Sequence, residues 1–117
     1  LMNAQEMATA KKYGAQTIII VINNGIYGSI RMHQERAFPT RNIGTDLENP
    51  DFIAYAEAFG VNAFRVTKTA EFEKAFEEAM AKPGPSLIEL VVSEEAISPA
   101  FTLSELIERS LDAQEEK

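Results

Sequence analysis

The chain has 117 residues, of which 45% are hydrophobic, and carries a net charge of -7 at pH 7. These values suit one small domain and argue against a nucleic-acid binder, which needs a basic face. Cysteine is absent, so disulfides and thiolate metal sites are excluded. No apolar run approaches a membrane span and no signal-peptide pattern opens the chain, so we expect a cytoplasmic protein that binds no membrane.

The first third of the chain predicts a helix, a strand and a short second helix. Residues 3–13 are good helix formers, and Gly14 is placed to end the helix. The β-branched run 18–22 is continuously apolar, which predicts a strand buried on both faces, as in a parallel sheet. Residues 28–36 suit a short helix, and the stretch from Pro39 to Thr45 is typical of a loop.

The middle of the chain predicts a further helix and strand. Asn49 precedes Pro50, which predicts a helix with Asn49 as N-cap and proline at its first position. Apolar residues then recur on one face until Gly60, which is placed to close the helix. Residues 61–66 form the next predicted strand.

The last part of the chain predicts two helices around a third strand. Thr69 suits the N-cap of a helix whose inward face has helical spacing and consists of Phe72, Ala75, Phe76, Ala79 and Met80. We read this stripe as core rather than as a cofactor site. Residues 87–92 predict the third strand, interrupted only by Glu89. Thr102 and Glu105 form a capping-box pair before the last helix.

Strands that alternate with helices over this length predict an α/β fold with a parallel sheet. Three strands are few for such a sheet. At least one edge should therefore be bare and able to pair with another chain.

The stretch Asn23-Asn24-Gly25 has two interpretations. Asn-Gly is a hairpin-turn signal, but the residues that follow lack the alternation of a returning strand. The alternative is a hard-cation site, because amide and carbonyl oxygens at a strand end suit Mg²⁺ or Ca²⁺. Ligands bind beyond the carboxyl ends of parallel strands, and a helix starting near Gly28 would favour a phosphate there.

Other polar residues leave alternatives open. His33 is the only histidine, so it suggests a surface or structural residue rather than a metal site. Glu35 could act as an acid or base, but we expect an exposed helix carboxylate. Glu89 either pairs with a buried cation or lies at a strand end. Three arginines flank the loop and either attract an anionic substrate or keep the loop soluble: Arg31, Arg36 and Arg41.

The sequence resembles a known enzyme superfamily. The stretches MNAQEMATAKKYG and TIIIVINNGIYGSIRMHQE, with FPTRNIGTDLENPDFIAYAEAFG and PGPSLIELVV downstream, resemble the thiamin diphosphate-binding domain of the acetolactate synthase, pyruvate oxidase and benzoylformate decarboxylase superfamily. The resemblance covers about residues 2–92. It implies the C-terminal portion of that domain for residues 1–117, with a helical tail at 93–117. The implied fold is a partial three-layer α/β sandwich, a parallel sheet with helices on both faces.

The resemblance implies a cofactor site at the end of the first strand. Thiamin diphosphate would be bound along Asn24, Gly25, Ile26, Tyr27 and Gly28, with the Asn24 side chain and the Ile26 carbonyl as Mg²⁺ ligands. The stretch 30–45 would correspond to the segment that becomes ordered over the cofactor in relatives. No catalytic residue is expected in this chain.

The superfamily's motif begins with Gly-Asp-Gly and ends in Asn-Asn, and only the Asn-Asn half is present. The chain also opens at Leu1 within a helix-like stretch. We therefore expect a fragment that does not catalyse alone, from a thiamin diphosphate- and Mg²⁺-dependent homodimer or homotetramer acting on 2-keto acids by carboligation or decarboxylation. The alternative is a non-enzymatic α/β module that pairs with another chain. A different nucleotide binder is disfavoured, because neither Gly-x-Gly-x-x-Gly nor a P-loop occurs.

Overall fold

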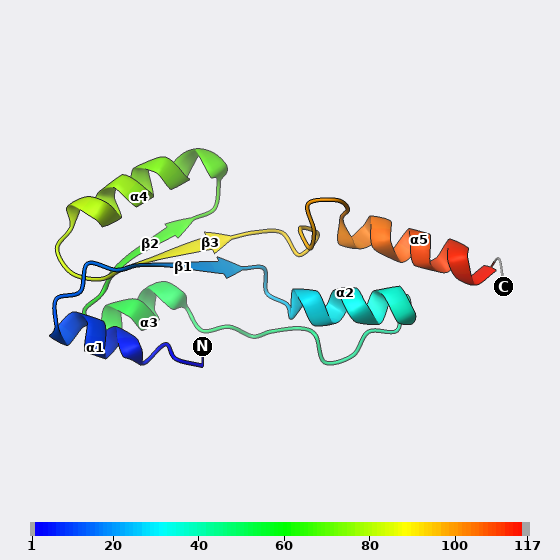
Figure 1. The fold of residues 1–117 in the computed structure, drawn as a ribbon, viewed down its shortest axis with the longest axis horizontal. Coiled ribbons are helices and arrows are strands. Elements are labelled where there is room, and N and C mark those ends of the chain that lie inside the picture. The colour runs from blue at the N-terminus through cyan, green and yellow to red at the C-terminus, as the bar shows by residue number, and fades with distance from the viewer. Residues whose placement is uncertain (1, 116–117) are drawn as a thin grey trace. The chain divides into compact units, whose positions relative to one another are not determined.

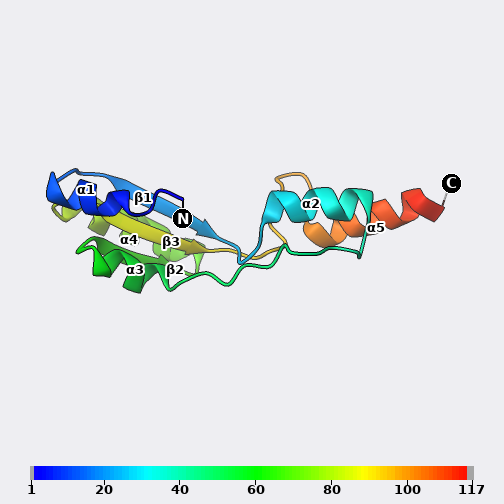
Figure 2. The ribbon, with the colours of Figure 1, turned by 90° about the horizontal axis from the view of Figure 1, so that it is seen from below.

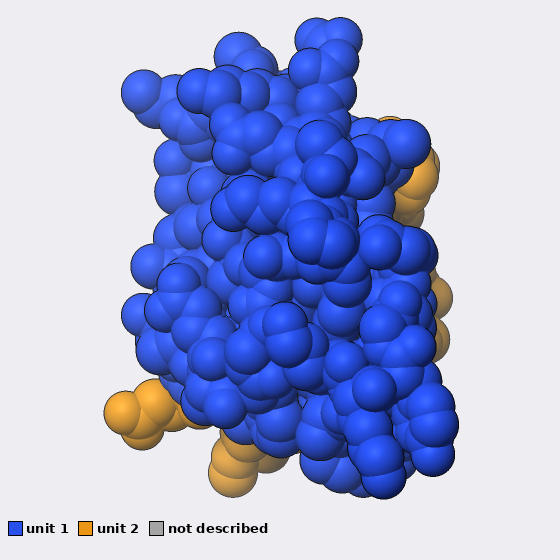
Figure 3. All heavy atoms as spheres, turned by 90° about the vertical axis from the view of Figure 1, so that its left-hand side faces the viewer, with its two compact units in different colours: residues 1–23, 49–91 blue, residues 24–48, 92–117 orange. Residues whose placement is uncertain are grey.

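A computed structural model describes residues 2–115 of the chain. Two compact units appear, coloured separately in Figure 3: residues 1–23 with 49–91, here called the sheet unit, and residues 24–48 with 92–117, here called the helix unit. In chain order the elements are α1 (Glu6–Lys12), β1 (Ile18–Asn23), α2 (Gly28–Ala37), α3 (Phe52–Ala58), β2 (Asn62–Val66), a 3-10 turn η1 (Thr69–Glu71), α4 (Phe72–Ala81), β3 (Ser86–Val91) and α5 (Leu103–Glu115).

The sheet unit contains three parallel strands in the order β1-β3-β2. The central strand, β3, has its first four residues buried. The expectation that residues 18–22 are buried on both faces is wrong, because β1 is an edge strand on which Ile20 is 44% and Ile22 70% exposed. The strand covered on all sides is β3, which has a neighbour at each edge.

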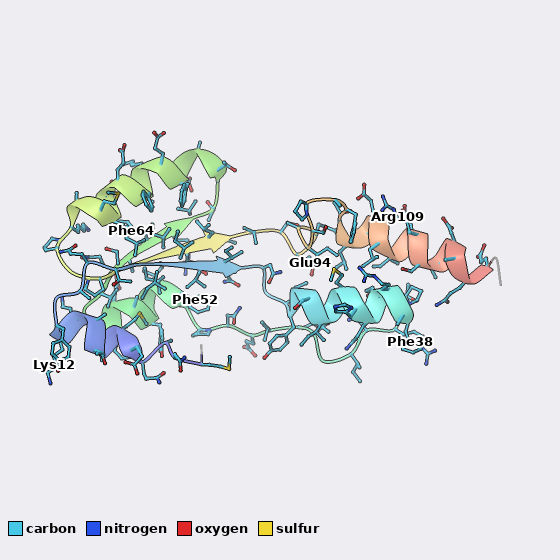
Figure 4. All side chains as sticks on the ribbon, viewed as in Figure 1. Lys12, Phe38, Phe52, Phe64, Glu94 and Arg109 are labelled. Carbon is cyan, nitrogen blue, oxygen red and sulfur yellow. The ribbon has the colours of Figure 1, made fainter. Side chains whose placement is uncertain are left out.

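Helices cover both faces of the sheet, as the resemblance implied (Figure 1). On one face α1 and α3 pack through Met7, Phe52 and Ala56 against Leu87 and the inward side of β1. On the other face α4 packs through Ala79 against Ile88 and Val66. Phe52, which belongs to the first of these core clusters, and Phe64, which packs against the second, are labelled in Figure 4. The three-layer α/β sandwich is confirmed within this unit.

Two helix starts differ from the prediction. The N-cap of α3 is Asp51 and not Asn49, because Oδ1 of Asp51 accepts hydrogen bonds from the backbone N–H groups of Ile53 and Ala54. Thr69 does not cap α4 but opens η1, where the carboxylate of Glu71 accepts from the backbone of the preceding residues.

The predicted inward face of α4 is correct except at its end. Phe72, Ala75, Phe76 and Ala79 pack in the core. Met80 is 64% exposed, because it follows Ala79 by about 100° around the helix and turns away from the sheet.

In the helix unit, α2 and α5 run side by side (Figures 1 and 2). Leu103 and Leu106 are the buried apolar residues of α5. The predicted capping box is confirmed: Thr102 N–H donates to Glu105 Oε2 at 2.8 Å and Glu105 N–H to Thr102 Oγ1 at 3.2 Å. Within residues 2–115 no helix has the length and apolarity needed to cross a membrane.

Candidate functional site

A tight turn at residues 24–28 follows β1 and leads directly into α2. Gly25 has a φ of +70°, a conformation that glycine adopts without strain. The Asn24 side chain folds back over the turn, and its Oδ1 accepts a hydrogen bond from Ile26 N–H at 3.3 Å. Since a helix begins at Gly28, no returning strand follows, and the hairpin interpretation of Asn23-Asn24-Gly25 is wrong.

Within the described residues, the N-terminus of α2 has no side-chain cap. Its N-cap, Tyr27, makes no capping hydrogen bond through its side chain, and the first turn holds no acidic residue. A Cβ on Gly28 would lie 3.0 Å from Nδ2 of Asn24, so glycine lets the helix start against that amide. A ten-residue helix with open N–H groups at its start offers donors and a positive dipole end to an anion.

A short backbone pairing holds the turn in place from the other side. Ile26 and Asp46 form an antiparallel bridge, in which Tyr27 N–H donates to the Thr45 carbonyl at 2.8 Å and Leu47 N–H to the Gly25 carbonyl at 2.9 Å. Neither bond uses the Ile26 carbonyl. The turn therefore presents two uncharged oxygen atoms that could serve as metal ligands: the amide oxygen of Asn24 and the carbonyl oxygen of Ile26.

The donor set fits Mg²⁺ in combination with a phosphate group. Among residues 2–115 no three His, Asp or Glu side chains are grouped to hold a metal ion. Amide and carbonyl oxygens suit a hard cation, and Mg²⁺ commonly completes its shell with substrate phosphate oxygens. The open helix start beside the turn suits that phosphate, so the residues present fit the cofactor that the sequence resemblance implied.

A second polar cluster lies at the carboxyl end of the sheet, within the sheet unit. Glu89 is buried at 3% exposure. Its Oε1 accepts from Asn23 Nδ2 at 2.7 Å, and its Oε2 from Arg65 Nε at 2.7 Å. Asn49 Nδ2 donates to Asn23 Oδ1 at 3.0 Å, and Arg65 also reaches Asp51 at 2.8 Å. Of the two interpretations of Glu89, pairing with a cation is correct, but the cation is not buried, because 42% of the Arg65 side chain is exposed.

The charges of this cluster support one another. The hydrogen bond to Glu89 is the main cause that raises the pKa of Arg65 above its ordinary value. The pKa of Asp51 is lowered, first by the hydrogen bond from the Ala54 backbone and also by Arg65. Sequence reasoning missed Arg65 and Asp51. An acidic residue in an apolar strand signals a missing cation, but Arg65 becomes its neighbour only through the β2–β3 register.

The remaining candidates fall on α2 and the loop after it. His33 is exposed, as expected of a surface histidine, and Arg36 and Arg41 are exposed too. Glu35 contradicts the expectation of an exposed carboxylate, because its residue exposure is 0%. The side chain points inward, where Arg31 donates to it at 2.8 Å.

The fold and the turn define a class of protein: an α/β domain with a parallel sheet, in which a turn that presents two oxygen atoms leads into a helix. Comparison with known proteins narrows the class. Residues 1–90 match the family described as "Thiamine pyrophosphate enzyme, C-terminal TPP binding domain". The chain belongs to this family of thiamine pyrophosphate enzymes.

Several curated proteins are similar to the chain. It is 34% identical over 94 residues to the acetolactate synthase large subunit of Parasynechococcus marenigrum (strain WH8102), covering 79% of the chain and 15% of that protein. It is 35% identical over 102 residues to the probable chloroplastic acetolactate synthase 2 of Oryza sativa subsp. japonica, with the same coverage. It is 30% identical over 115 residues to the acetolactate synthase isozyme 2 large subunit of Escherichia coli (strain K12), covering 93% of the chain. The chain spans 21% of that last protein.

Proposed function

We propose that residues 24–28 anchor the diphosphate of thiamin diphosphate through Mg²⁺, in an enzyme that acts on 2-keto acids. The observation that carries this proposal is the turn itself. Asn24 and Ile26 present two neutral oxygens, and the uncapped start of α2 follows within two residues. The chemistry of donors and anion site matches a metal–diphosphate group.

The reaction class is proposed from the relatives. Those described above are named as acetolactate synthases, so carboligation of 2-keto acids is the first choice and simple decarboxylation the second. When bound, the thiazolium ring of the cofactor would supply the electron sink for cleavage next to the keto group. The role of this chain would be to bind the cofactor and to orient it. Its Asn24 and Ile26 oxygens would fix the metal, and the Tyr27 and Gly28 backbone would face the diphosphate.

We also propose that residues 1–117 do not catalyse by themselves. The two ligands they offer are uncharged, and the chain holds no Gly-Asp-Gly sequence that would add an anionic ligand. Mg²⁺ gives up its bound water reluctantly, so two neutral oxygens hold it weakly without further charge.

The test is substitution of Asn24 in the enzyme that contains this segment. Asn24→Ala should weaken binding of Mg²⁺ with thiamin diphosphate by about 10-fold or more, because one ligand is lost. It should change the free energy of unfolding by less than about 1 kcal/mol, since among the described residues the Asn24 side chain loses the 3.3 Å hydrogen bond from Ile26 N–H. Cofactor titration followed by fluorescence, together with denaturant unfolding, measures both quantities.

Two further variants sharpen the result. Asn24→Asp keeps an oxygen ligand and should retain most of the affinity. Asn3→Ala alters an exposed asparagine in the sheet unit and should change nothing. An affinity of Asn24→Ala equal to that of the unaltered enzyme would remove Asn24 from the metal site.

A further inference from the structure

The buried carboxylate of Glu35 has no part in the proposed metal site, yet its surroundings tie it to that turn. It lies in the last turn of α2, with 1% of its side chain exposed. A negative charge there opposes the helix dipole, and the order Arg31 then Glu35 is the less favourable one for a helical ion pair. Stabilisation of the helix alone therefore does not account for Glu35, and burial of its charge requires compensation.

The compensation comes from the loop that follows α2. Glu35 Oε2 accepts a hydrogen bond from Thr40 N–H at 2.6 Å. Thr40 has a φ of +63°, the one described residue other than glycine with a positive φ. This conformation costs free energy for a β-branched residue, so a strong charge-assisted bond is needed to keep it. Glu35 thus determines where the chain turns back toward the start of α2.

Gln34 fixes the next stretch of the same loop. Its Nε2 donates to the Ile43 carbonyl at 3.1 Å, and its Oε1 accepts from Ile43 N–H at 2.8 Å. Two bonds between one side chain and one residue define both position and orientation. Two residues later comes Thr45, which is fully buried and whose carbonyl accepts from Tyr27 N–H.

The contacts form a closed path within the helix unit. It runs from Glu35 and Gln34 through the loop to residues 45–47, and from there by the Ile26–Asp46 bridge to the turn that carries Asn24. Arg31 closes the path, since its Nε donates to Glu35 at 2.8 Å and its Nη1 lies 3.9 Å from Asp46 Oδ1. Moving the loop therefore moves the backbone that presents the Ile26 carbonyl.

We propose that Glu35 is a positioning residue for the metal–diphosphate turn, acting through Thr40 and the 45–47 bridge. The inference rests on the proposed function of residues 24–28. Supporting partners of metal ligands typically change metal affinity by about 10- to 100-fold when mutated. Glutamine is the informative replacement, because its amide group would present a donor to Arg31 or Thr40, both of which are donors themselves.

The first measurement needs no cofactor. In the full chain, Glu35→Gln should raise the hydrogen-exchange rates of the Tyr27 and Leu47 amides, while the Ile88 amide in the sheet keeps its rate. The second measurement uses the enzyme that contains this segment, where the same variant should weaken binding of Mg²⁺ with thiamin diphosphate by about 10-fold or more. Glu48→Gln, at an exposed position just beyond the bridge, is the matched control and should alter neither.

Each outcome bears on the inference. Unchanged exchange at Tyr27 and Leu47 overturns it, and so does faster exchange with unchanged affinity, which would leave Glu35 a purely structural residue. If the unaltered enzyme fails to bind the cofactor, the proposed function fails and the inference falls with it. Should Glu35→Gln not fold, Gln34→Ala removes the Ile43 contacts at a more exposed position and should weaken affinity by about threefold.

Discussion

Glu89 shows at the scale of a single residue how the sheet tolerates a charge. Both of its oxygens are hydrogen-bonded, to Asn23 and to Arg65, and the Arg65 side chain keeps 42% of its surface exposed. One partner therefore remains in contact with water, which lowers the cost of burying the pair. The carboxylate also accepts a hydrogen bond from the amide of Asn23, the last residue of β1, and so holds the carboxyl end of that strand against β3.

Removing this carboxylate should destabilise the chain. We expect Glu89→Ala to lower the free energy of unfolding by about 3 kcal/mol, because the hydrogen bonds from Asn23 and Arg65 to the carboxylate are lost and a cavity replaces the side chain. Glu89→Gln keeps the volume and one acceptor and should lower it by about 2 kcal/mol. Denaturant unfolding measures both values. The control is Glu77→Ala at an exposed position of α4, expected within about 0.5 kcal/mol of the unaltered chain.

A loss for Glu89→Ala no larger than for the control would mean that Glu89 is solvated and contributes nothing to the stability of the sheet.

Glu89 also shows how much of a site the sequence can predict at the scale of one residue. An acidic residue in an apolar run predicts that a cationic partner exists, but the sequence does not say which residue is that partner. Glu35 gave no such signal, because a carboxylate among polar residues on a short helix has the pattern of a surface position. Its burial depends on a loop contact five residues away.

The elements themselves were predictable where their pattern is local. Apolar runs located the strands, and helical spacing located α4, because both periodicities follow from backbone geometry. The caps were less predictable. Asn49 and Asp51 are both good N-cap residues, and Asn49 is instead engaged by Asn23, which is distant in sequence. The capping box of α5 was predicted correctly because its two partners lie within one turn.

The start of α5 depends on a second acidic cap. Glu95 accepts hydrogen bonds at 2.9 Å from both the backbone N–H and the hydroxyl of Ser104. The Ser104 backbone is the main cause that lowers the pKa of Glu95 below its ordinary value of 4.5. A folded-state pKa below the unfolded one means that the carboxylate stabilises the folded state above pH 4.5, and that this contribution is lost as the pH falls through the folded pKa.

The Ser104 amide chemical shift should therefore titrate with a midpoint below pH 4.5. NMR spectra recorded from about pH 2 to about pH 7 measure this midpoint, because the range extends from well below the ordinary carboxyl pKa to neutral pH. Glu95→Gln still accepts through its amide oxygen but cannot titrate, so this step should vanish while α5 persists. A midpoint at or above 4.5 in the unaltered chain would show that the Glu95–Ser104 bonds do not favour the charged form.

At the scale of the whole molecule, one edge of the sheet, β1, is left open by the described residues. The described residues give β1 a partner on one side only, β3, while Ile20 and Ile22 are exposed on it. No proline or charged residue interrupts Ile18–Asn23, and these are the devices that keep natural edges from pairing. Sequence reasoning anticipated a bare edge from the small number of strands. It could not assign the edge to β1, since a continuous apolar run is equally typical of a central strand.

The chain should therefore self-associate through β1. We expect the apparent mass from light scattering to rise with protein concentration, and Ile22→Lys to suppress the rise, because a charge on the edge disfavours strand pairing. Ile43→Lys makes the same change at a residue that is 80% exposed and lies in the loop of the helix unit, against 70% for Ile22. If general surface hydrophobicity drives association, the Ile43 variant should be at least as effective. If the strand edge drives it, only Ile22→Lys will yield a monomer. A monomeric mass for the unaltered chain at every concentration would show that the β1 edge does not mediate self-association in solution.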